Sequence, residues 1–267
     1  MNTMDILKEQ TQALAARRSF AVVTLVSGES TARSTGKMLV YENGESSGTI
    51  GGGVLEATAR ADALKAIKSN TTLCQSYDLT SDASEKGMSC GGKATVMIEP
   101  YVSRPVLVMV GAGHVGHAVL KLAGFVGFET VLVDDRDEAE IGDTVALADS
   151  FVKVEDFESG VAALDVPETA SFVLAAHGHD LDCAALAGAL TRKFAYLGMI
   201  GSKKKIQALY AKLREKGVTE EQLSQVHSPI GLDIGGETPE AIALSIVAEV
   251  MMVKNGRSGS SCAEAAK

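Results

Sequence analysis

Positive charge is scarce in this sequence, whose 267 residues include 25 Lys and Arg but 34 Asp and Glu, a formal net charge of −9. General nucleic-acid binders carry a basic face, so this deficit argues against that class. Hydrophobic residues make up 46% of the chain and charged residues 22%, which is typical of a globular protein and not of a disordered one. At this length we expect two domains.

Cysteines are few and widely separated. The four lie at Cys74, Cys90, Cys183 and Cys262, and no two of them have a short spacing. The pattern therefore offers neither a zinc knuckle nor a disulfide framework. Such cysteine usage suits a reducing compartment, and we expect a cytoplasmic protein.

Long hydrophobic runs are also missing. The longest apolar segment, 241–253, is too short to span a bilayer and contains Glu249. Residues 1–12 are polar and lack the hydrophobic region of a signal peptide. We therefore expect no membrane association. Because 241–253 is apolar nearly all round, a single domain would not cover it completely, which predicts a homodimer or larger assembly.

A linker is predicted at residues 100–105 (PYVSRP), because proline at both ends removes backbone donors and interrupts helices and strands alike. The predicted organisation is an N-terminal domain over 1–101 and a C-terminal domain over 102–257. The small, polar tail 258–267 is predicted to be disordered.

The N-terminal domain is predicted to be a small α+β domain. Asn43-Gly44 supplies the positive φ angles of a tight hairpin turn. Periodicity and turn residues predict helices over 4–17 and from the triple glycine to about 68, with strands over 19–26, 37–41, 46–50, 71–79 and 93–99.

The C-terminal domain begins with a Rossmann fingerprint. The apolar run 106–110 leads into Gly111-x-Gly113-x-x-Gly116, and a second strand ends in Asp134, 21 residues beyond Gly113. Strands and helices then alternate, which predicts a parallel sheet with helices on both faces. The predicted elements are 106–110, 114–126, 130–133, a strand near 151, 171–175, 181–192, 194–199, 203–216 and 238–254.

Each glycine of the fingerprint has a physical reason. Gly111 permits a tight turn, Gly113 lets the backbone approach a pyrophosphate, and Gly116 lets the helix pack on the strand. The helix start offers N–H groups and partial positive charge to an anion. We therefore predict a dinucleotide-like ligand, with Asp134 on free ribose hydroxyls and Arg136 able to tolerate a 2′-phosphate. A glycine turn without a ligand is the alternative.

A second glycine cluster, Gly51, Gly52 and Gly53, also lies between a strand and a helix, so it predicts a second anion site. Glu56 in that helix would disfavour a bare phosphate but could bond to a pterin or base edge. Upstream, Arg33 and Lys37 add positive charge. The alternative is again a turn with no ligand.

Cys90 stands beside Gly91 and Gly92, whose N–H groups could stabilise a thiolate. A functional thiol and a buried cysteine in a turn both remain open.

Further candidates follow two later strands of the C-terminal domain. His177 and His179 lie where a parallel sheet binds ligands, and we expect them to face the crevice while Asp180 or Asp182 caps the next helix. A His-x-His-x-x-Asp metal site lacks an evident third strong ligand and is disfavoured.

The loop after the next strand carries Ser202 and Lys203. Ser202 is predicted to cap the following helix, and Lys203 to reach a phosphate. A solvated charge run is the alternative for Lys203.

Taken together, these segments resemble the XdhC/CoxI family, the accessory proteins of xanthine-dehydrogenase-type molybdenum hydroxylases. The resemblance covers nearly the whole chain and both predicted domains in order. The matching segments are 36–40, 48–53 with Leu55-Glu56, 90–92, 111–116, 177–182, 198–202, 228–235 and 237–243.

The resemblance implies a chaperone with no catalytic residues of its own. Its cargo would be molybdenum cofactor, as molybdopterin or molybdopterin cytosine dinucleotide, protected while a cysteine desulfurase installs the terminal sulfido ligand and then passed to a hydroxylase. The loop 111–116, including His114, would hold the pyrophosphate, and the pterin and metal end would face Gly51–Gly53 and Cys90.

Two other classes remain compatible with the same residues. An NAD(P)-dependent oxidoreductase would use the Rossmann loop with His177 or His179 as acid/base. A nucleotide-binding regulatory subunit would use the loop and carry no cargo.

Overall fold

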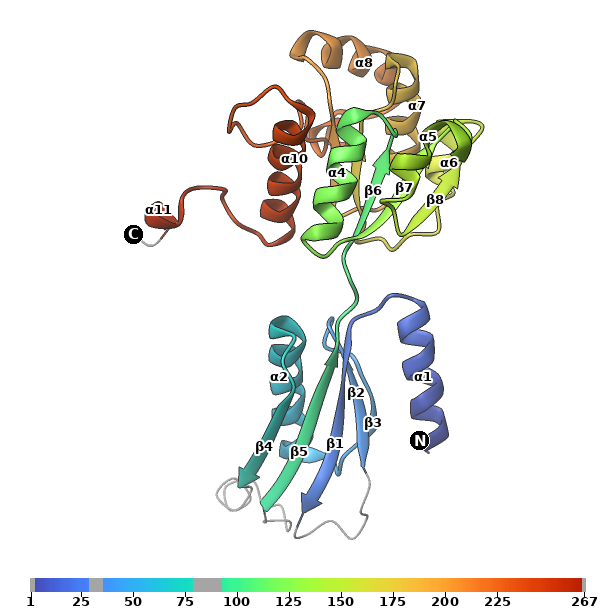
Figure 1. Ribbon diagram of the computed structural model, residues 1–267. Helices are drawn as coiled ribbons and strands as arrows, with labels where there is room; N and C mark the ends of the chain where they lie inside the picture. Colours follow the sequence, from blue (N-terminus) through green and yellow to red (C-terminus); the bar gives the residue numbers. More distant parts are fainter. Residues whose placement is uncertain (1–2, 29–35, 79–92, 266–267) are drawn as a thin grey trace. The chain divides into compact units, whose positions relative to one another are not determined.

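The computed structural model describes residues 3–28, 36–78 and 93–265, so Arg33 and Cys90 lie outside the described residues (Figure 1). The chain forms two compact units, Met1–Ser103 and Arg104–Lys267. The first combines an antiparallel sheet with helices and the second is built on a parallel sheet, which confirms the predicted fold class.

Unit 1 is a five-stranded antiparallel sheet with the order β3-β2-β1-β5-β4. Its strands are β1 (Phe20–Gly28), β2 (Lys37–Tyr41), β3 (Ser46–Thr49), β4 (Leu73–Asp78) and β5 (Lys93–Tyr101). Its helices, within the described residues, are α1 (Thr3–Ala15) and α2 (Gly53–Ser69). Residues alternate along β1: Ala21 and Val23 pack with α2, whereas Phe20 and Val22 pack with α1 on the opposite face. Each face of the central strand therefore has its own small core.

Unit 2 is a five-stranded parallel sheet with the order β10-β9-β6-β7-β8. Its strands are β6 (Val106–Val110), β7 (Glu129–Asp134), β8 (Ser150–Lys153), β9 (Ser171–Leu174) and β10 (Tyr196–Met199). From the first strand the chain builds outward in one direction through β7 and β8, and then in the other through β9 and β10. The order reverses between β6 and β9, and ligands of such sheets bind outside the carboxyl ends of the strands at that point.

Helices cover both faces of this sheet, as predicted. All five residues of β6 are buried, and they alternate between two cores. Val108 faces the core of α6 (Phe157–Ala162), α7 (His179–Leu190) and α8 (Lys203–Glu215), and Met109 faces that of α4 (His114–Phe125) and α10 (Pro239–Lys254). Figure 1 shows α4 and α10 side by side on one face.

In the described part of the chain, four short helices were not predicted: α5 (Glu138–Val145), α6, α9 (Glu220–Ser224) and α11 (Cys262–Ala265). The last lies in the tail that was predicted to be disordered. Two of them begin with capping residues that can be recognised in the sequence. Asp156 accepts a hydrogen bond from the Ser159 N–H at the start of α6, and Thr219 with Gln222 forms a capping box at the start of α9.

Helix α10 shows how the acidic residue within its apolar stretch, Glu249, is accommodated. The Glu249 carboxylate accepts hydrogen bonds from the Tyr196 hydroxyl at 2.5 Å and the Gly231 N–H at 2.9 Å, so it ties the segment after β10 to the helix. Burial and the Glu249 carboxylate raise the pKa of Tyr196 well above its usual range. On the outer side of α10, Leu244 and Met251 are 52% and 38% exposed, and association through this helix stays a prediction.

Among the described residues, no helix has the length and apolar character needed to cross a bilayer.

Candidate ligand-binding crevice

The glycine turn after β6 lies at the point where the strand order reverses. Gly111 has φ +106°, and a Cβ there would lie 2.2 Å from the Ala175 carbonyl oxygen, in the loop after β9. A Cβ at Gly116 would lie 2.0 Å from the Gly111 carbonyl oxygen. Both positions therefore require glycine for conformation or close packing, as the fingerprint predicted.

Gly113 differs from these two because it faces open space. A Cβ there would meet no described atom within 4 Å. Gly113 is also the N-cap of α4, and within the described chain no side chain caps this helix. The first N–H groups of α4 thus point, with the positive end of the helix dipole, into a region that a ligand can enter.

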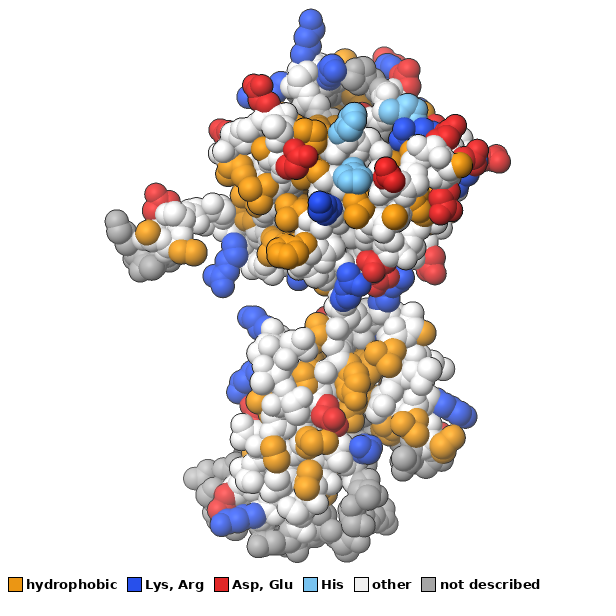
Figure 2. Space-filling model, viewed as in Figure 1, with side chains coloured by type: hydrophobic (Ala, Val, Ile, Leu, Met, Phe, Trp, Pro, Cys, Tyr) orange, Lys and Arg blue, Asp and Glu red, His pale blue; other side chains and the backbone are white. Residues whose placement is uncertain are grey.

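A cavity of about 640 Å³ adjoins this helix start. His117 stands in it with Nδ1 3.1 Å from Thr144 Oγ1. Figure 2 shows histidine side chains on the face of unit 2 that carries α4. Residues lining the cavity include Ala112, Gly113, His114, His117, Arg136, Thr144 and Pro239.

Asp134, the acid of the fingerprint, is fully buried and engaged by its own chain. Its carboxylate accepts hydrogen bonds from the Ala112 N–H at 2.7 Å and from the Arg136 N–H, Nε and Nη2 at 3.1, 2.8 and 2.9 Å. Burial raises the pKa of Asp134, but the bonds from Arg136 and Ala112 outweigh it and hold the pKa below its usual value. The carboxylate thus shapes the glycine turn, and its contact with a ribose stays a prediction.

The next acid, Asp135, lies beside His177. His177 Nδ1 is 3.8 Å from Asp135 Oδ1, and the His177 side chain is 46% exposed. Ligand atoms of Asp134, Asp135 and His177 all lie within 4.8 Å of one another, a spacing compatible with a metal ion. Arg136, however, already binds both oxygens of Asp134, so a cation would have to displace a guanidinium. This arrangement argues against a metal at the cluster.

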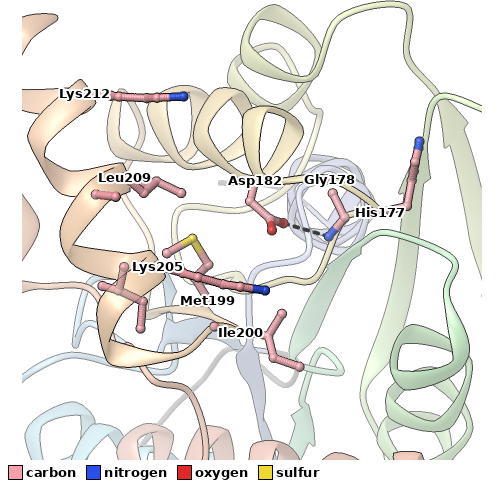
Figure 3. A pocket seen from close by; sticks show the side chains of 12 residues that line it. His177, Gly178, Asp182, Met199, Ile200, Lys205, Leu209 and Lys212 are labelled. Atoms are coloured by element: carbon pink, nitrogen blue, oxygen red, sulfur yellow. Dashed lines mark hydrogen bonds between the residues drawn. The ribbon is translucent and has the colours of Figure 1, made fainter.

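A second cavity, of about 710 Å³, lies between the loops that follow β9 and β10 (Figure 3). Asp182, in its lining, is buried and accepts a hydrogen bond from the Ala176 N–H at 2.8 Å, so it braces the loop after β9. Of the side chains predicted here, His177 lines the cavity, while the side chain of His179 lies outside the described residues. Other lining residues include Met199, Ile200, Lys205, Ile206, Leu209 and Lys212.

The predicted cap at Ser202 is present, since its Oγ accepts a hydrogen bond from the Lys205 N–H at 3.4 Å. The cavity is lined by Lys205 and Lys212, however, and not by Lys203. The sequence did indicate which residues of α8 share a face, because 205, 209 and 212 recur at helical spacing. Lys203 was predicted because it lies nearest the loop, and Lys205 and Lys212 were missed.

The glycine cluster of unit 1 is arranged differently. Glu56 Oε1 accepts a short hydrogen bond from the Thr49 hydroxyl and bonds from the Ile50 and Gly52 N–H groups at 3.0 and 2.9 Å. Burial raises the pKa of Glu56, but these bonds outweigh it and hold the pKa below its usual value. N–H groups that were predicted to bind an external anion therefore donate to a carboxylate of this chain, and the turn alternative describes the arrangement better.

Of the other residues predicted around that cluster, Arg33 lies outside the described residues, and Lys37 lies opposite Thr49 on the neighbouring strand. Lys37 donates from Nζ to Thr24 Oγ1 at 2.9 Å, on the neighbouring strand. The positive φ angles of Gly51, Gly52 and Gly53, +131°, +83° and +64°, explain why glycine stands at each position.

These features define a class of protein: a doubly wound Rossmann unit with an open helix start at its glycine turn, joined to a smaller antiparallel α+β unit. The particular family follows from comparison with known proteins. A family model described as the XdhC Rossmann domain matches residues 107–250, and one described as the XdhC and CoxI family matches residues 13–78. The chain belongs to the XdhC/CoxI family.

Three curated relatives are similar to this chain. An uncharacterized protein, YqeB, of Escherichia coli K12 is 33% identical over 258 residues, which cover 96% of this chain and 47% of the relative. The molybdenum cofactor insertion chaperone PaoD of the same organism is 26% identical over 287 positions, covering 96% and 90%. A probable xanthine dehydrogenase subunit of Bacillus subtilis 168 is 27% identical over 157 residues, covering 59% and 44%. The chain spans about half the length of YqeB and of the Bacillus protein.

Proposed function

We propose that this protein is a non-catalytic maturation factor of the cytoplasm. It binds molybdenum cofactor, plain or as the cytosine dinucleotide, protects it while a cysteine desulfurase supplies the terminal sulfido ligand, and passes it to a xanthine-dehydrogenase-type hydroxylase. Family membership and the similarity to PaoD support this role. The observation that carries it is a pair of cavities, of about 640 and 710 Å³, on either side of an open glycine turn.

The first cavity is lined by the glycine turn, and the second by the loop after β9, on which the turn packs. Gly111 packs directly on Ala175 and Ala176, and Asp135 and His177 approach each other from the two sides. A ligand with two bulky ends joined by a pyrophosphate would fit this plan. Its pyrophosphate would lie on the start of α4, with a nucleotide in the first cavity and a pterin in the second.

This arrangement differs from the division of the cofactor between domains that the sequence suggested. Glu56 already takes N–H groups of the turn at Gly51–Gly53, so a pterin there would compete with an intramolecular carboxylate. We therefore assign the pterin end to unit 2. Cys90 remains the proposed soft ligand for molybdenum or for transient persulfide chemistry.

One observation favours a second candidate, an NAD(P)-dependent oxidoreductase. His177 lies 3.8 Å from Asp135 beside the Rossmann turn, an arrangement that could serve acid/base chemistry. The ammonium of Lys205 in the neighbouring cavity opposes it, because an oxidised nicotinamide ring is itself positively charged.

The test uses a substitution that fills the open turn without disturbing the fold. Gly113 has φ −73° and ψ −178°, the extended conformation of a helix N-cap, and aspartate is among the best N-cap residues. In Gly113→Asp the new carboxylate would take the N–H groups meant for the pyrophosphate. Gly124→Asp, at the far end of the same helix and with open space around its Cβ, is the control with the same charge change.

The full-length protein should be purified from a host that makes the cofactor, and its molybdenum and pterin measured by elemental analysis and fluorescence. We expect both in the wild type and in Gly124→Asp, with at least a tenfold loss in Gly113→Asp, whose melting temperature should not fall. Absence of molybdenum and pterin from the wild type would refute the proposal. Robust turnover of NAD(P)H with common alcohols, aldehydes or hydroxy acids would favour the oxidoreductase instead.

A further inference from the structure

The cavity between the loops after β9 and β10 has mostly apolar walls. Met199 and Ile200 end β10 and begin its loop, and Ile206 and Leu209 form the facing side of α8. Figure 3 shows Leu209 on α8 and the Met199 sulfur between Leu209 and Asp182. Such walls suit a ring system, because they remove apolar surface from water and offer no polar partner for its faces.

Two charged groups on these walls are already engaged with their own chain. Lys212 Nζ forms an ion pair with Asp180 Oδ1 at 2.8 Å, so its charge is offset across the rim between α7 and α8. Asp182 is buried and bonds the Ala176 N–H. The charge of Lys212 is therefore paired, whereas the Asp182 carboxylate keeps its negative charge, because its bond comes from a neutral N–H group.

Lys205 is the exception. Among the described residues it has no side-chain hydrogen bond and no ion pair, and Figure 3 shows it extending from α8 with its nitrogen on the side of Ile200. Lys205 is an exposed residue that lines the cavity, so its ammonium can pair with an anionic group on a ligand held there. The cavity therefore combines a surface for a ring with an ammonium that can pair with an acidic substituent.

We propose that this cavity binds a pterin-type heterocycle that carries an anionic substituent, and that Lys205 is the charge partner of that substituent. This inference rests on the proposed function, since it names the end of the cargo that the second cavity takes. Lys203, which the sequence favoured, has no part in it.

The test uses two fluorescent probes that share one ring and differ in charge. Cofactor-free, full-length protein is titrated with pterin-6-carboxylate and with 6-hydroxymethylpterin, which is neutral. A charge-assisted hydrogen bond distinguishes the two, so the wild type should bind the carboxylate about tenfold more tightly. Raising the salt concentration should reduce this preference.

Three variants locate the charge. Lys205→Gln should weaken binding of pterin-6-carboxylate about tenfold and leave 6-hydroxymethylpterin unchanged. Lys203→Gln, on the same turn of α8 with the same loss of charge, should stay within about twofold of the wild type for both probes. Lys212→Gln should fall between them, because Asp180 already offsets that lysine. Urea unfolding of all three should match the wild type.

Equal losses in Lys203→Gln and Lys205→Gln, or none in Lys205→Gln, would overturn the assignment, and so would failure of both probes to bind the wild type. If any of these results were found while the purified wild type still carried molybdenum and pterin, the maturation role would stand and the pterin would bind outside this cavity. Lys205-dependent binding of the carboxylate by a protein that acquires no molybdenum would uphold the cavity and reject the maturation role.

Discussion

The glycine turn at 51–53 and the glycine turn at 111–116 both lie between a strand and a helix, and the two helix starts are satisfied in opposite ways. In unit 1 the Glu56 carboxylate folds back and accepts the Ile50 and Gly52 N–H groups. In unit 2 the acid near the turn, Asp134, accepts the Ala112 N–H, and α4 begins at Gly113 with no capping side chain among the described residues.

The origin of the acid decides the difference. Glu56 lies in the first turn of α2, so its carboxylate can fold back onto the N–H groups at the start of its own helix. Asp134 is the last residue of β7, so its carboxylate contacts the 111–116 turn from the sheet and leaves the start of α4 open. In these two turns, the N–H groups at the helix start stay open to a ligand only where the chain does not supply its own anion. Four changes test this contrast.

The largest effect is expected at Gly116. A Cβ there would lie 2.0 Å from the Gly111 carbonyl oxygen, so Gly116→Ala should force the turn and helix apart and lower the free energy of unfolding by about 3 kcal/mol. Urea unfolding of the full chain, with hydrogen exchange of β6 to read unit 2 separately, measures it. Gly124→Ala, in open space on the same helix, should lose no stability. Equal stability of both variants would show that the turn relaxes freely.

The second effect is expected at Asp134. Asp134→Asn removes a buried charge that accepts four hydrogen bonds and should lower the free energy of unfolding of unit 2 by about 2 kcal/mol. Asp135→Asn, at the next residue and partly exposed, should change it by less than about 0.5 kcal/mol. A comparable loss of stability in both variants would mean that the hydrogen bonds accepted by Asp134 make no specific contribution.

A smaller effect is expected at Glu56. Glu56→Gln should lower the free energy of unfolding of unit 1 by about 1.5 kcal/mol at pH 7, because the carboxylate accepts bonds that an amide accepts more weakly. The folded-state pKa lies below the ordinary value of 4.5, so this stabilisation is fully present above pH 4.5. It is lost as the pH falls through the folded-state pKa.

Chemical denaturation at a series of pH values from 7 to 3 measures that difference. The gap between wild type and Glu56→Gln should close on the acid side, whereas Glu42→Gln, on an exposed turn of the same unit, should follow the wild type throughout. A gap that widens at low pH would contradict the assigned direction of the pKa shift.

The smallest effect concerns the open turn and a simple anion. Inorganic pyrophosphate at about five times its Kd should raise the free energy of unfolding of unit 2 by about 1 kcal/mol. Gly113→Asp should lose this stabilisation and Glu56→Gln should keep it, as read by thermal shift at constant ionic strength. If pyrophosphate stabilised Gly113→Asp as well as the wild type, the start of α4 would not be its site.

Much of the architecture could be predicted because it depends on local patterns. The alternating strands and helices of unit 2, the hairpin at Asn43-Gly44 and the cap at Ser202 follow from periodicity and turn chemistry. Helices α5, α6 and α9 were missed because, at eight, six and five residues, they are too short for periodicity to reveal. Helices α6 and α9 have side-chain capping bonds and buried contacts through Phe157 and Leu223, whereas α5 has no such cap and buries Ile141.

By itself the sequence determined the fold class, the positions of the two glycine turns and the residues that only glycine can be, since φ angles and hydrophobic periods are properties of short segments. Only the tertiary structure decided which turn is open, which acid faces inward and which lysine enters the second cavity. Each of these depends on where a side chain ends after strands far apart in the chain have been placed side by side. Glu56 and Asp134 look equally suited to a ligand in the sequence, and packing commits both carboxylates to their own backbone.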